Sequence, residues 1–299
     1  MLYVNLKKKL NRRLKFRKLQ KSNKEIYPLF KSLINSKINI FDIGAGQRML
    51  PEIINFNGIS KVFLVDPNEN IQYSYDQLSR YFSDTKNIFK YRYGISDKTK
   101  KLKYFKSHKS TISTFAFNDK KLKMNSNYYS DKNEYIKVYS FSDFLKKFKL
   151  PKPDIIKIDV EGLEAQVLSS VLKTSDPLIV QIETNMNNSM LHESFSKINN
   201  LLIKNNYFLY TLFPSYGNVH SSKNADIDLK DIELNFIKNH IVQSECYYVK
   251  KKNKYTVKDL VCFCAYGLRE YFKKILNISI NRLTENEKKN FKKLEKIIN

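Results

Sequence analysis

The sequence has few of the residues from which disulfide frameworks and metal knuckles are built. Its three cysteines, Cys246, Cys262 and Cys264, are an odd number without framework spacing. This usage predicts a reduced, cytoplasmic chain. A single residue separates Cys262 from Cys264, which is too close for the usual zinc-knuckle spacing, so both are expected to pack as small apolar groups.

Long apolar segments are also missing. The longest apolar run, Leu260 to Leu268, is far short of the roughly 20 residues that cross a bilayer. The N-terminus is basic, but no apolar stretch follows it, so a secretory signal is not expected. The sequence therefore predicts no transmembrane segment.

Acidic residues are scarce beside basic ones. The chain has 29 Asp and Glu against 54 Lys and Arg, which gives a net charge of +25. Such a field attracts polyanions and anionic membrane surfaces. However, tryptophan is absent, glycine numbers only 7, and Lys, Asn, Ile, Tyr and Phe are abundant. This bias extends along the whole chain and indicates a general compositional preference, so the charge alone does not identify a nucleic-acid partner.

Short apolar runs alternate with helical patterns from residue 38 onward. This alternation is typical of a doubly wound α/β fold. The expected strands are 38–43, 62–65, 88–93, 102–105, 135–139, 155–158, 178–182, 207–213 and 241–249. The expected helices are 49–56, 69–82, 141–148, 163–172 and 189–205, and residues 94–97 are expected to form a turn. No clear helix joins the last two strands, which predicts an antiparallel pair at the end of a mainly parallel sheet.

Three segments are expected along the chain. Residues 38–250 form the main domain, residues 1–37 a basic helical N-terminal extension, and residues 251–299 a basic helical C-terminal extension. The N-terminal extension has leucines on one face, and it either docks on anionic lipid or nucleic acid or, as we prefer, is a solvated helix. Two long polar connections, 107–133 and 214–240, are expected to line a binding pocket.

A cluster of carboxylates follows the buried run at 155–158. Asp159, Glu161 and Glu164 stand around Gly162, where the chain can turn sharply, and a helical pattern comes next. In an open parallel sheet, ligands lie outside the carboxyl ends of the strands. Asp159 and Glu161 are therefore candidate site residues, whereas Glu164 is expected to favour the positive end of the helix.

The stretch Asp42-Ile43-Gly44-Ala45-Gly46 follows the first expected strand and predicts a cofactor loop, because glycine lets the backbone approach a ligand closely. Asp66 lies 20 residues beyond Gly46, at the end of the next strand. An acid in that place accepts hydrogen bonds from ribose hydroxyls. The third glycine of a dinucleotide loop is missing, which favours S-adenosylmethionine over a pyrophosphate. Asp42 then either faces the methionine end of the cofactor or forms a turn with nearby amides.

Five motifs occur in order: FDIGAG, VFLVDPN, YGISD, DIIKIDVEGLEAQVL and LIVQIE. Together they resemble the FkbM-type family of S-adenosylmethionine-dependent methyltransferases. The resemblance implies a class I methyltransferase fold, with a Rossmann-like sheet of seven strands and the last one antiparallel. It also implies O-methylation, commonly of sugar or polyketide hydroxyls.

By position, the resemblance assigns Asp42 and Gly44 to the cofactor loop, Asp66 to the ribose, and Ser96 and Asp97 to the neighbourhood of the adenine. The family loop usually reads D-x-G-A-N-x-G. Here Gly46 stands at the asparagine and Arg48 at the second glycine, and Asp66 replaces the usual glutamate.

Methyl transfer to a hydroxyl requires an aligned acceptor and removal of its proton. Asp159 and Glu161 are the candidates for positioning and deprotonation, and Glu183 for holding the acceptor, a small molecule or a glycan. Asp159, Glu183 and Asn185 include the oxygen ligands that hard cations prefer. Carboxylates at strand ends also bind sugars, and no metal site is predicted. The four histidines are expected at the surface.

The main rival is an RNA methyltransferase acting on ribose 2′-hydroxyls, which explains the charge. Asp159 and Glu245 fit part of the Lys-Asp-Lys-Glu set of such enzymes, but no lysine occurs between Gln181 and His192. Base methylation is not indicated, because the segment after Ile158 lacks an Asn/Asp-Pro-Pro-aromatic turn and no cysteine follows a proline. A non-catalytic binding protein that kept the fold is the third reading.

Overall fold

A seven-stranded sheet forms the centre of the molecule in the computed structural model, which describes residues 26–46, 51–106, 115, 134–186, 193–216 and 241–298. The strand order is β3-β2-β1-β7-β8-β10-β9. Its strands are β1 (Ile38–Ile43), β2 (Ser60–Val65), β3 (Ile88–Tyr91), β7 (Ile155–Ile158), β8 (Ile179–Asn185), β9 (Tyr207–Tyr216) and β10 (Ile241–Lys250). β10 runs antiparallel to both of its neighbours, whereas the pairs from β3 to β8 are parallel. The predicted α/β fold, with its antiparallel last strand, is confirmed.

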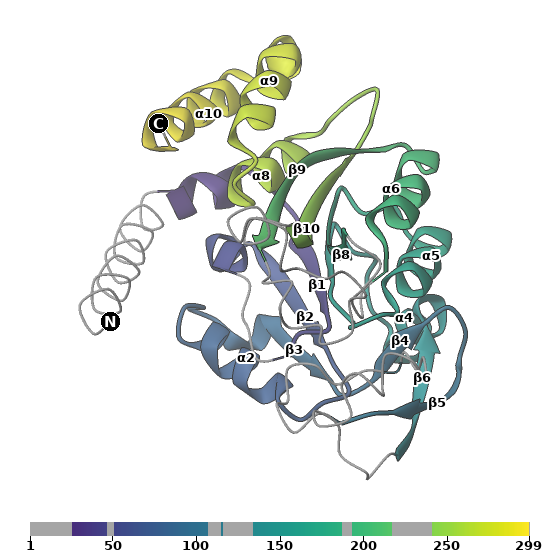
Figure 1. Ribbon diagram of the computed structural model, residues 1–299. Helices are drawn as coiled ribbons and strands as arrows, with labels where there is room; N and C mark the ends of the chain where they lie inside the picture. Colours follow the sequence, from purple (N-terminus) through teal and green to yellow (C-terminus); the bar gives the residue numbers. More distant parts are fainter. Residues whose placement is uncertain are drawn as a thin grey trace, which may run out of the picture.

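Helices cover both faces of this sheet (Figure 1). One face carries α4 (Phe141–Phe148), α5 (Glu164–Thr174) and α6 (Phe195–Lys204). The other face carries the helical residues 26–33, η1 (Pro51–Phe56), α2 (Ile71–Ser79) and α8 (Val257–Ala265). The remaining helices are η2 (Thr85–Asn87), α9 (Arg269–Ser279), η6 (Ile280–Arg282) and α10 (Glu285–Ile298).

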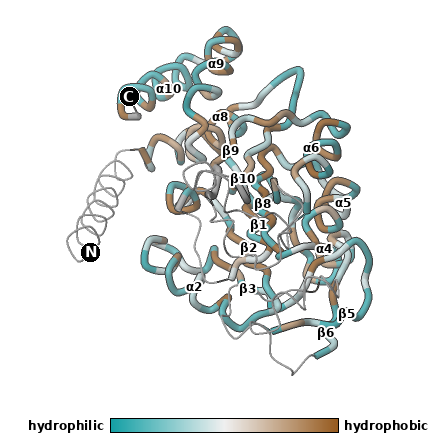
Figure 2. The backbone as a smooth tube through the Cα atoms, in the orientation of Figure 1, coloured by the Kyte–Doolittle hydropathy of each residue, from teal (hydrophilic) through white to brown (hydrophobic). Residues whose placement is uncertain are grey.

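Strand alternation divides the core into two hydrophobic clusters, one on each face. Ile40 and Ile155 point to the α8 face, while Ile156 and Ile158 point to the α5 face. Figure 2 shows the hydrophobic residues concentrated along the central strands. Both faces of β7 are buried, as the β-branched run at 155–158 predicts.

A second, three-stranded sheet has the order β4-β6-β5 and contains β4 (Gly94–Ser96), β5 (Lys100–Tyr104) and β6 (Glu134–Ser140). The prediction of a turn at residues 94–97 was wrong, because residues 94–96 pair in parallel with β6. The reason is tertiary: a side chain at Gly94 would overlap Val138 and Phe115, so the small residue permits close packing of β4 in this sheet.

Several sequence predictions lie partly or wholly outside the described residues. These are the basic N-terminal helix before residue 26, Arg48, the start of the helix expected at 189–205, and most of the connections 107–133 and 214–240. The helix expected at 49–56 is a 3-10 helix over Pro51–Phe56, and the helix expected at 69–82 is the shorter α2.

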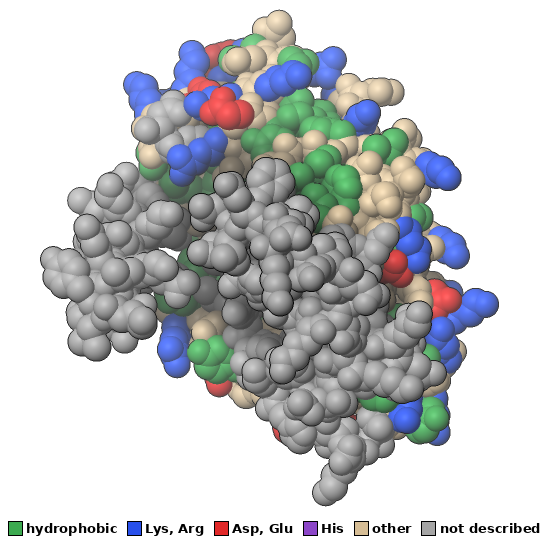
Figure 3. Space-filling view, viewed as in Figure 1, with side chains coloured by type: hydrophobic (Ala, Val, Ile, Leu, Met, Phe, Trp, Pro, Cys, Tyr) green, Lys and Arg blue, Asp and Glu red, His purple; other side chains and the backbone are tan. Residues whose placement is uncertain are grey.

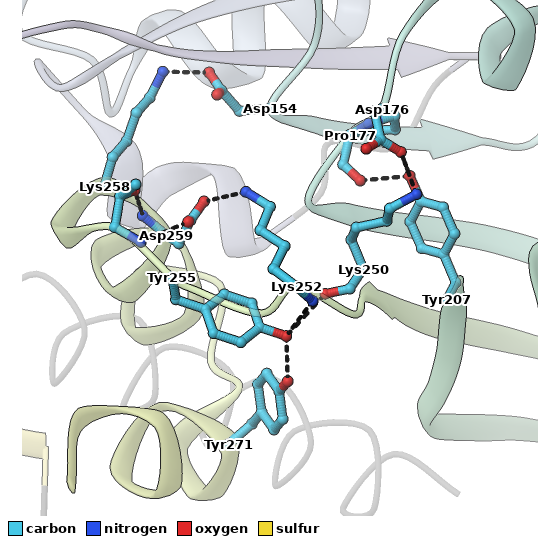
Figure 4. Close-up of polar contacts among 11 residues, drawn as sticks. Asp154, Asp176, Pro177, Tyr207, Lys250, Lys252, Tyr255, Lys258, Asp259 and Tyr271 are labelled. Atoms are coloured by element: carbon cyan, nitrogen blue, oxygen red, sulfur yellow. Dashed lines mark hydrogen bonds and ion pairs between the residues drawn. The ribbon is translucent and has the colours of Figure 1, made fainter. Parts of the chain in front are cut away.

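The C-terminal segment packs directly on the sheet through α8. Every side chain from Asp259 to Ala265 is buried, and the apolar ones belong to the same cluster as Ile40 and Ile155. Figure 4 shows Lys258 of α8 reaching Asp154 at the start of β7, with a Nζ to Oδ2 distance of 2.7 Å. The same Oδ2 atom accepts a hydrogen bond from the Asn39 amide of β1 at 2.8 Å. Residues 259–265 are thus part of the core, and the division at residue 250 remains a prediction about folding units.

No helix within the described ranges is both long and apolar enough to span a membrane.

We expect Phe263→Ala to lower the free energy of unfolding by about 3–5 kcal/mol, because it leaves a cavity in a closely packed aromatic cluster. The Phe263 ring is fully buried, with centroids 5.5 Å from Tyr255 and 5.0 Å from Tyr271. Urea unfolding followed by circular dichroism measures the loss. Ile278→Ala, at a position 65% exposed on α9, is the control and should change stability by about 0.5 kcal/mol or less. Equal effects of the two substitutions would show that α8 is not part of the core.

Candidate functional site

The predicted cofactor loop leaves the carboxyl end of β1 and packs against the end of β7. Gly44 has a φ of +83°, and a Cβ atom there would overlap the carbonyl oxygen of Asp159. The Gly44 amide donates to the Val65 carbonyl of β2 at 2.8 Å. Among the described residues, the atom nearest to a Cβ on Gly46 would be the Gly44 carbonyl oxygen at 3.7 Å. The backbone is thus tightly fitted at Gly44 and leaves space for a ligand at Gly46.

Asp66, the predicted ribose-binding acid, holds this loop. Its carboxylate accepts hydrogen bonds from the Gly46 amide at 2.9 Å and from the Asn68 amide at 2.7 Å. The hydroxyl of Ser74 on α2 completes the support by donating to the Ala45 carbonyl at 2.7 Å. Burial raises the pKa of Asp66 to about 6, although both amide hydrogen bonds act to lower it. Each carboxylate oxygen can accept more than one hydrogen bond, so these contacts leave room for a ribose hydroxyl.

Of the predicted site residues, Asp42 has the most unusual surroundings. Its side chain is 1% exposed, and neither carboxylate oxygen accepts a hydrogen bond from the described residues. Burial raises its pKa to about 6, with Lys157 opposing the shift. Buried polar groups normally have partners. An ionised Asp42 on the strand that leads into the glycine loop therefore fits a ligand with a cationic group, and S-adenosylmethionine has both a sulfonium and an ammonium.

Lys157 is a site residue that sequence reasoning did not select. It lies in the middle of β7, and its Nζ atom is 2.9 Å from Oδ2 of Asp159 and 3.7 Å from Oδ1 of Asp42. Burial alone would lower the pKa of Lys157, but the charges of Asp159 and Asp42 outweigh it and hold that pKa above its usual range. The available signal was a lysine inside a run of three isoleucines, since a buried charge requires a partner.

A row of acidic residues lies beside this lysine, at the end of the sheet where the parallel strands have their carboxyl ends. Asp159 and Glu183 follow the paired residues Ile158 and Ile182, and Glu183 lies opposite Glu245 of β10. Alternation places all three acids on the α8 face, as with Lys157. We call Asp159, Glu183 and Glu245 the acid row. The sequence predicted the first two as site residues and considered Glu245 only for the RNA alternative.

Polar residues behind the acid row connect it to α8. The Gln181 side-chain amide donates to Glu245, and the hydroxyl of Tyr266, the C-terminal cap of α8, donates to the Gln181 carbonyl oxygen. Burial raises the pKa of Tyr266 well above its usual value, so this hydroxyl keeps its proton and acts as a donor. Sequence reasoning missed both Gln181 and Tyr266, which are 85 positions apart.

Glu161 has a φ of +53°, in the left-handed region that residues other than glycine rarely occupy. The turn around it is fixed by Glu164, whose fully buried carboxylate accepts hydrogen bonds from the Gly162 amide at 3.0 Å and from the Glu193 amide at 3.1 Å. Glu164 was expected only to interact with the positive end of the helix. It has a further structural role, because it joins the turn after β7 to the segment after β8.

Ser96 and Asp97, expected near the adenine, lie at the end of β4. The Ser96 hydroxyl donates to Asp97 at 3.0 Å and to Gln166 of α5 at 3.4 Å. The hydrogen bond from Lys100, with a Nζ to Oδ1 distance of 2.9 Å, lowers the pKa of Asp97. These side-chain contacts run to α5 and β5 and not to the glycine loop, so the adenine assignment remains a prediction.

In the part of the chain that the structure describes, no three His, Cys, Asp or Glu side chains come together in a way that could hold a metal ion. All four histidines lie outside the described residues. The three cysteines are free and buried.

The strand order with β10 reversed, the glycine loop after β1 and the acid after β2 define a class I S-adenosylmethionine-dependent methyltransferase. A sequence model of the methyltransferase FkbM domain matches residues 42–209, which is more than half of the chain. The chain therefore belongs to the FkbM methyltransferase family, as its motifs predicted. A search of curated protein sequences gave no match.

Solved structures with similar chains include other methyltransferases. An FkbM methyltransferase from Methylobacillus flagellatus KT is 14% identical with a TM-score of 0.37; the match covers 71% of this chain and 43% of that one. A precorrin-6y C5,15-methyltransferase from Geobacter metallireducens is 11% identical, with a TM-score of 0.36 and coverages of 76% and 87%. Magnesium protoporphyrin IX methyltransferase from Synechocystis, solved with S-adenosylmethionine bound, is 9% identical, with a TM-score of 0.38 and coverages of 78% and 79%.

Gly44 and Gly267 allow a matched comparison, since both have a φ of +83° but a Cβ atom at Gly267 would have no atom of the described residues within 4 Å. Gly267→Ala should cost about 1 kcal/mol for the left-handed backbone alone. Gly44→Ala should cost roughly 1–3 kcal/mol more, because Asp159 must move, and should weaken cofactor binding. Denaturant unfolding and calorimetric titration measure the two effects. Equal losses of stability would show that the contact between loop and β7 is not tight.

The raised pKa of Asp42 predicts a pH dependence of stability. Because the folded-state value is about 6 and the ordinary value is 3.8, the contribution of Asp42 to stability is fully present below pH 4 and is lost as the pH rises through 6. Asp42→Asn removes this loss. The stability of this variant relative to the unsubstituted protein should therefore rise between pH 4 and pH 8, by up to about 3 kcal/mol.

Thermal and urea unfolding across that pH range measure the change. Asp76→Asn, at an exposed position on α2, is the control for the substitution itself. A flat profile for Asp42→Asn would mean that Asp42 is not buried as a charged group.

Proposed function

We propose that this methyltransferase transfers a methyl group to a hydroxyl of a sugar, a glycan or a similar small hydroxylated acceptor. The observation that supports this acceptor class is the acid row, Asp159, Glu183 and Glu245, beside the cofactor loop. Carboxylates accept hydrogen bonds from hydroxyl groups. Several of them on adjacent strands suit an acceptor with several hydroxyls.

The cofactor would be held by the loop and by the acids around it. The Gly44 and Gly46 backbone gives close approach, Asp42 faces the cationic part, and Asp66 accepts from the ribose, while Ser96 and Asp97 are assigned to the adenine side by family position. S-adenosylmethionine supplies a methyl group whose bond to sulfur breaks, with the electron pair staying on sulfur, as the acceptor oxygen bonds to the methyl carbon.

On the acceptor side, we assign different roles to Asp159 and Glu161. Asp159 is tied to the Lys157 ammonium at 2.9 Å, and this fixed, charge-paired carboxylate orients the acceptor hydroxyl. Glu161 accepts the proton that the hydroxyl loses on methylation. Unfavourable backbone conformations are maintained mainly where function requires them, and the φ of +53° at Glu161 supports this assignment. Glu183 then holds a second hydroxyl of the acceptor.

RNA remains the second candidate acceptor because of the net charge of +25. Figure 3 shows that on the described part of one face the Lys and Arg side chains lie at several separate places around the edge. The acid row would repel a phosphate backbone at the place where the acceptor binds. This favours an uncharged hydroxylated acceptor. The free, buried cysteines support a reducing location, so the cytoplasm is the proposed compartment.

Glu161→Gln should spare cofactor affinity and lower turnover by roughly 100-fold or more, the usual contribution of a general base. Glu161→Gly should lower turnover similarly and raise stability by about 1 kcal/mol, because glycine relieves the left-handed strain. Lys149 provides the control, since it has a φ of 51° at the C-terminal cap of α4. Lys149→Gly should raise stability equally without loss of turnover. Unchanged turnover in both Glu161 variants would assign the proton to another group.

The proposed function itself is tested with purified full-length chain and S-adenosylmethionine labelled in the methyl group. Label should pass to uncharged sugars or glycans, and not to RNA of any length. Transfer to RNA ribose would establish the rival acceptor, and absence of cofactor binding in calorimetric titration would overturn the cofactor site as assigned.

A further inference from the structure

Lys157 is buried between the two halves of the site. It is 6% exposed, and its Nζ atom forms a hydrogen bond and ion pair of 2.9 Å with Asp159 on the acceptor side. On the cofactor side, Asp42 lies at the same register position of β1, with 3.7 Å between Nζ and Oδ1. No hydrogen bond from the described residues reaches the Asp42 carboxylate. One ammonium therefore faces two carboxylates that have different assigned tasks.

Burial makes these charges act strongly on each other and on any charge bound nearby. Asp42 is 1% exposed, and interactions between buried charges are screened far less by solvent and salt than those at a surface. Asp42, Lys157 and Asp159 together carry a formal charge of about −1, and the two carboxylates without the lysine would carry about −2. The lysine thus determines how negative this place is.

We infer that Lys157 is a positioning residue that fixes Asp159 toward the acceptor and sets the charge that the site presents to the cofactor through Asp42. The inference rests on the proposed function and deepens it. Its consequence concerns ligand preference: S-adenosylmethionine carries a sulfonium charge that the product S-adenosylhomocysteine lacks. By offsetting Asp42, Lys157 reduces the preference of the site for the charged cofactor over the neutral product.

The test is the ratio of the two dissociation constants, measured by calorimetric titration of the full chain at pH 8 with each ligand. A residue that only stabilises the fold would change both constants by the same factor and leave the ratio unchanged. Lys157→Met should shift the ratio toward S-adenosylmethionine by roughly fivefold or more, since it removes one positive charge at close range. Asp42→Asn should shift the ratio in the opposite direction.

Two further variants allow a conclusion even if Lys157→Met does not fold. Lys157→Met alone leaves Asp42 buried without its counter-charge and is the variant at risk of misfolding. The double variant Asp42→Asn with Lys157→Met removes both charges and should return the ratio to near the unsubstituted value. Lys61→Met, at an exposed position on β2, should change nothing.

If Lys157→Met leaves the ratio unchanged, the inference is overturned while the proposed function stands. If Lys157→Met does not fold, the same conclusion follows when the double variant and Asp42→Asn have equal ratios. If the unsubstituted chain binds neither ligand, the cofactor site and the role of Lys157 are both overturned. Opposite shifts in the two single variants, or a return of the Asp42→Asn shift in the double variant, support the inference.

Discussion

A positive charge in the middle of a parallel sheet is the constraint on which the site depends. β7 is buried along its whole length, yet its third residue is Lys157. Burying an ammonium without partners costs more than the whole free energy of unfolding of a typical domain. Asp42 on the adjacent strand and Asp159, directly after the end of β7, provide those partners. These ion pairs fix the position of the end of β1 relative to the end of β7.

The shape of the cofactor loop follows from the relative position of these two strand ends. Because the Asp159 carbonyl lies where a Cβ of residue 44 would be, only glycine fits there. The next support comes from β2, where Asp66 binds the Gly46 amide. Residues 44–46 of the loop are thus held in place by the neighbouring strands. Such preorganisation lowers the entropy cost of binding, and the burial of Asp42 without a hydrogen bond is a cost in stability that a cationic ligand can offset.

The sequence was sufficient for the features that depend on local pattern. Apolar runs identified the strands, the missing helix before β10 identified the reversed strand, and the motifs identified the family and its cofactor. It was not sufficient where a residue's role depends on a partner distant in the chain. Lys157 was part of a recognised motif, but its pairing with Asp42 follows only from the parallel register of β1 and β7. Tyr266 lies in a segment predicted as a separate extension, yet it reaches Gln181 in the sheet.

The local charge of the site and the overall charge of the chain have opposite signs, and distance determines which one acts on the acceptor. Electrostatic interactions between exposed charges are screened beyond about 8 Å at physiological ionic strength. The excess of lysines therefore influences solubility and the approach of large partners. Asp159, Glu183 and Glu245 are on adjacent strands, whose spacing is about 4.8 Å, so an acceptor bound there is within hydrogen-bonding range of them. Carboxylates accept hydrogen bonds from a hydroxyl and repel a phosphate, so at that range they support the proposed hydroxyl acceptor whatever the net charge of the molecule.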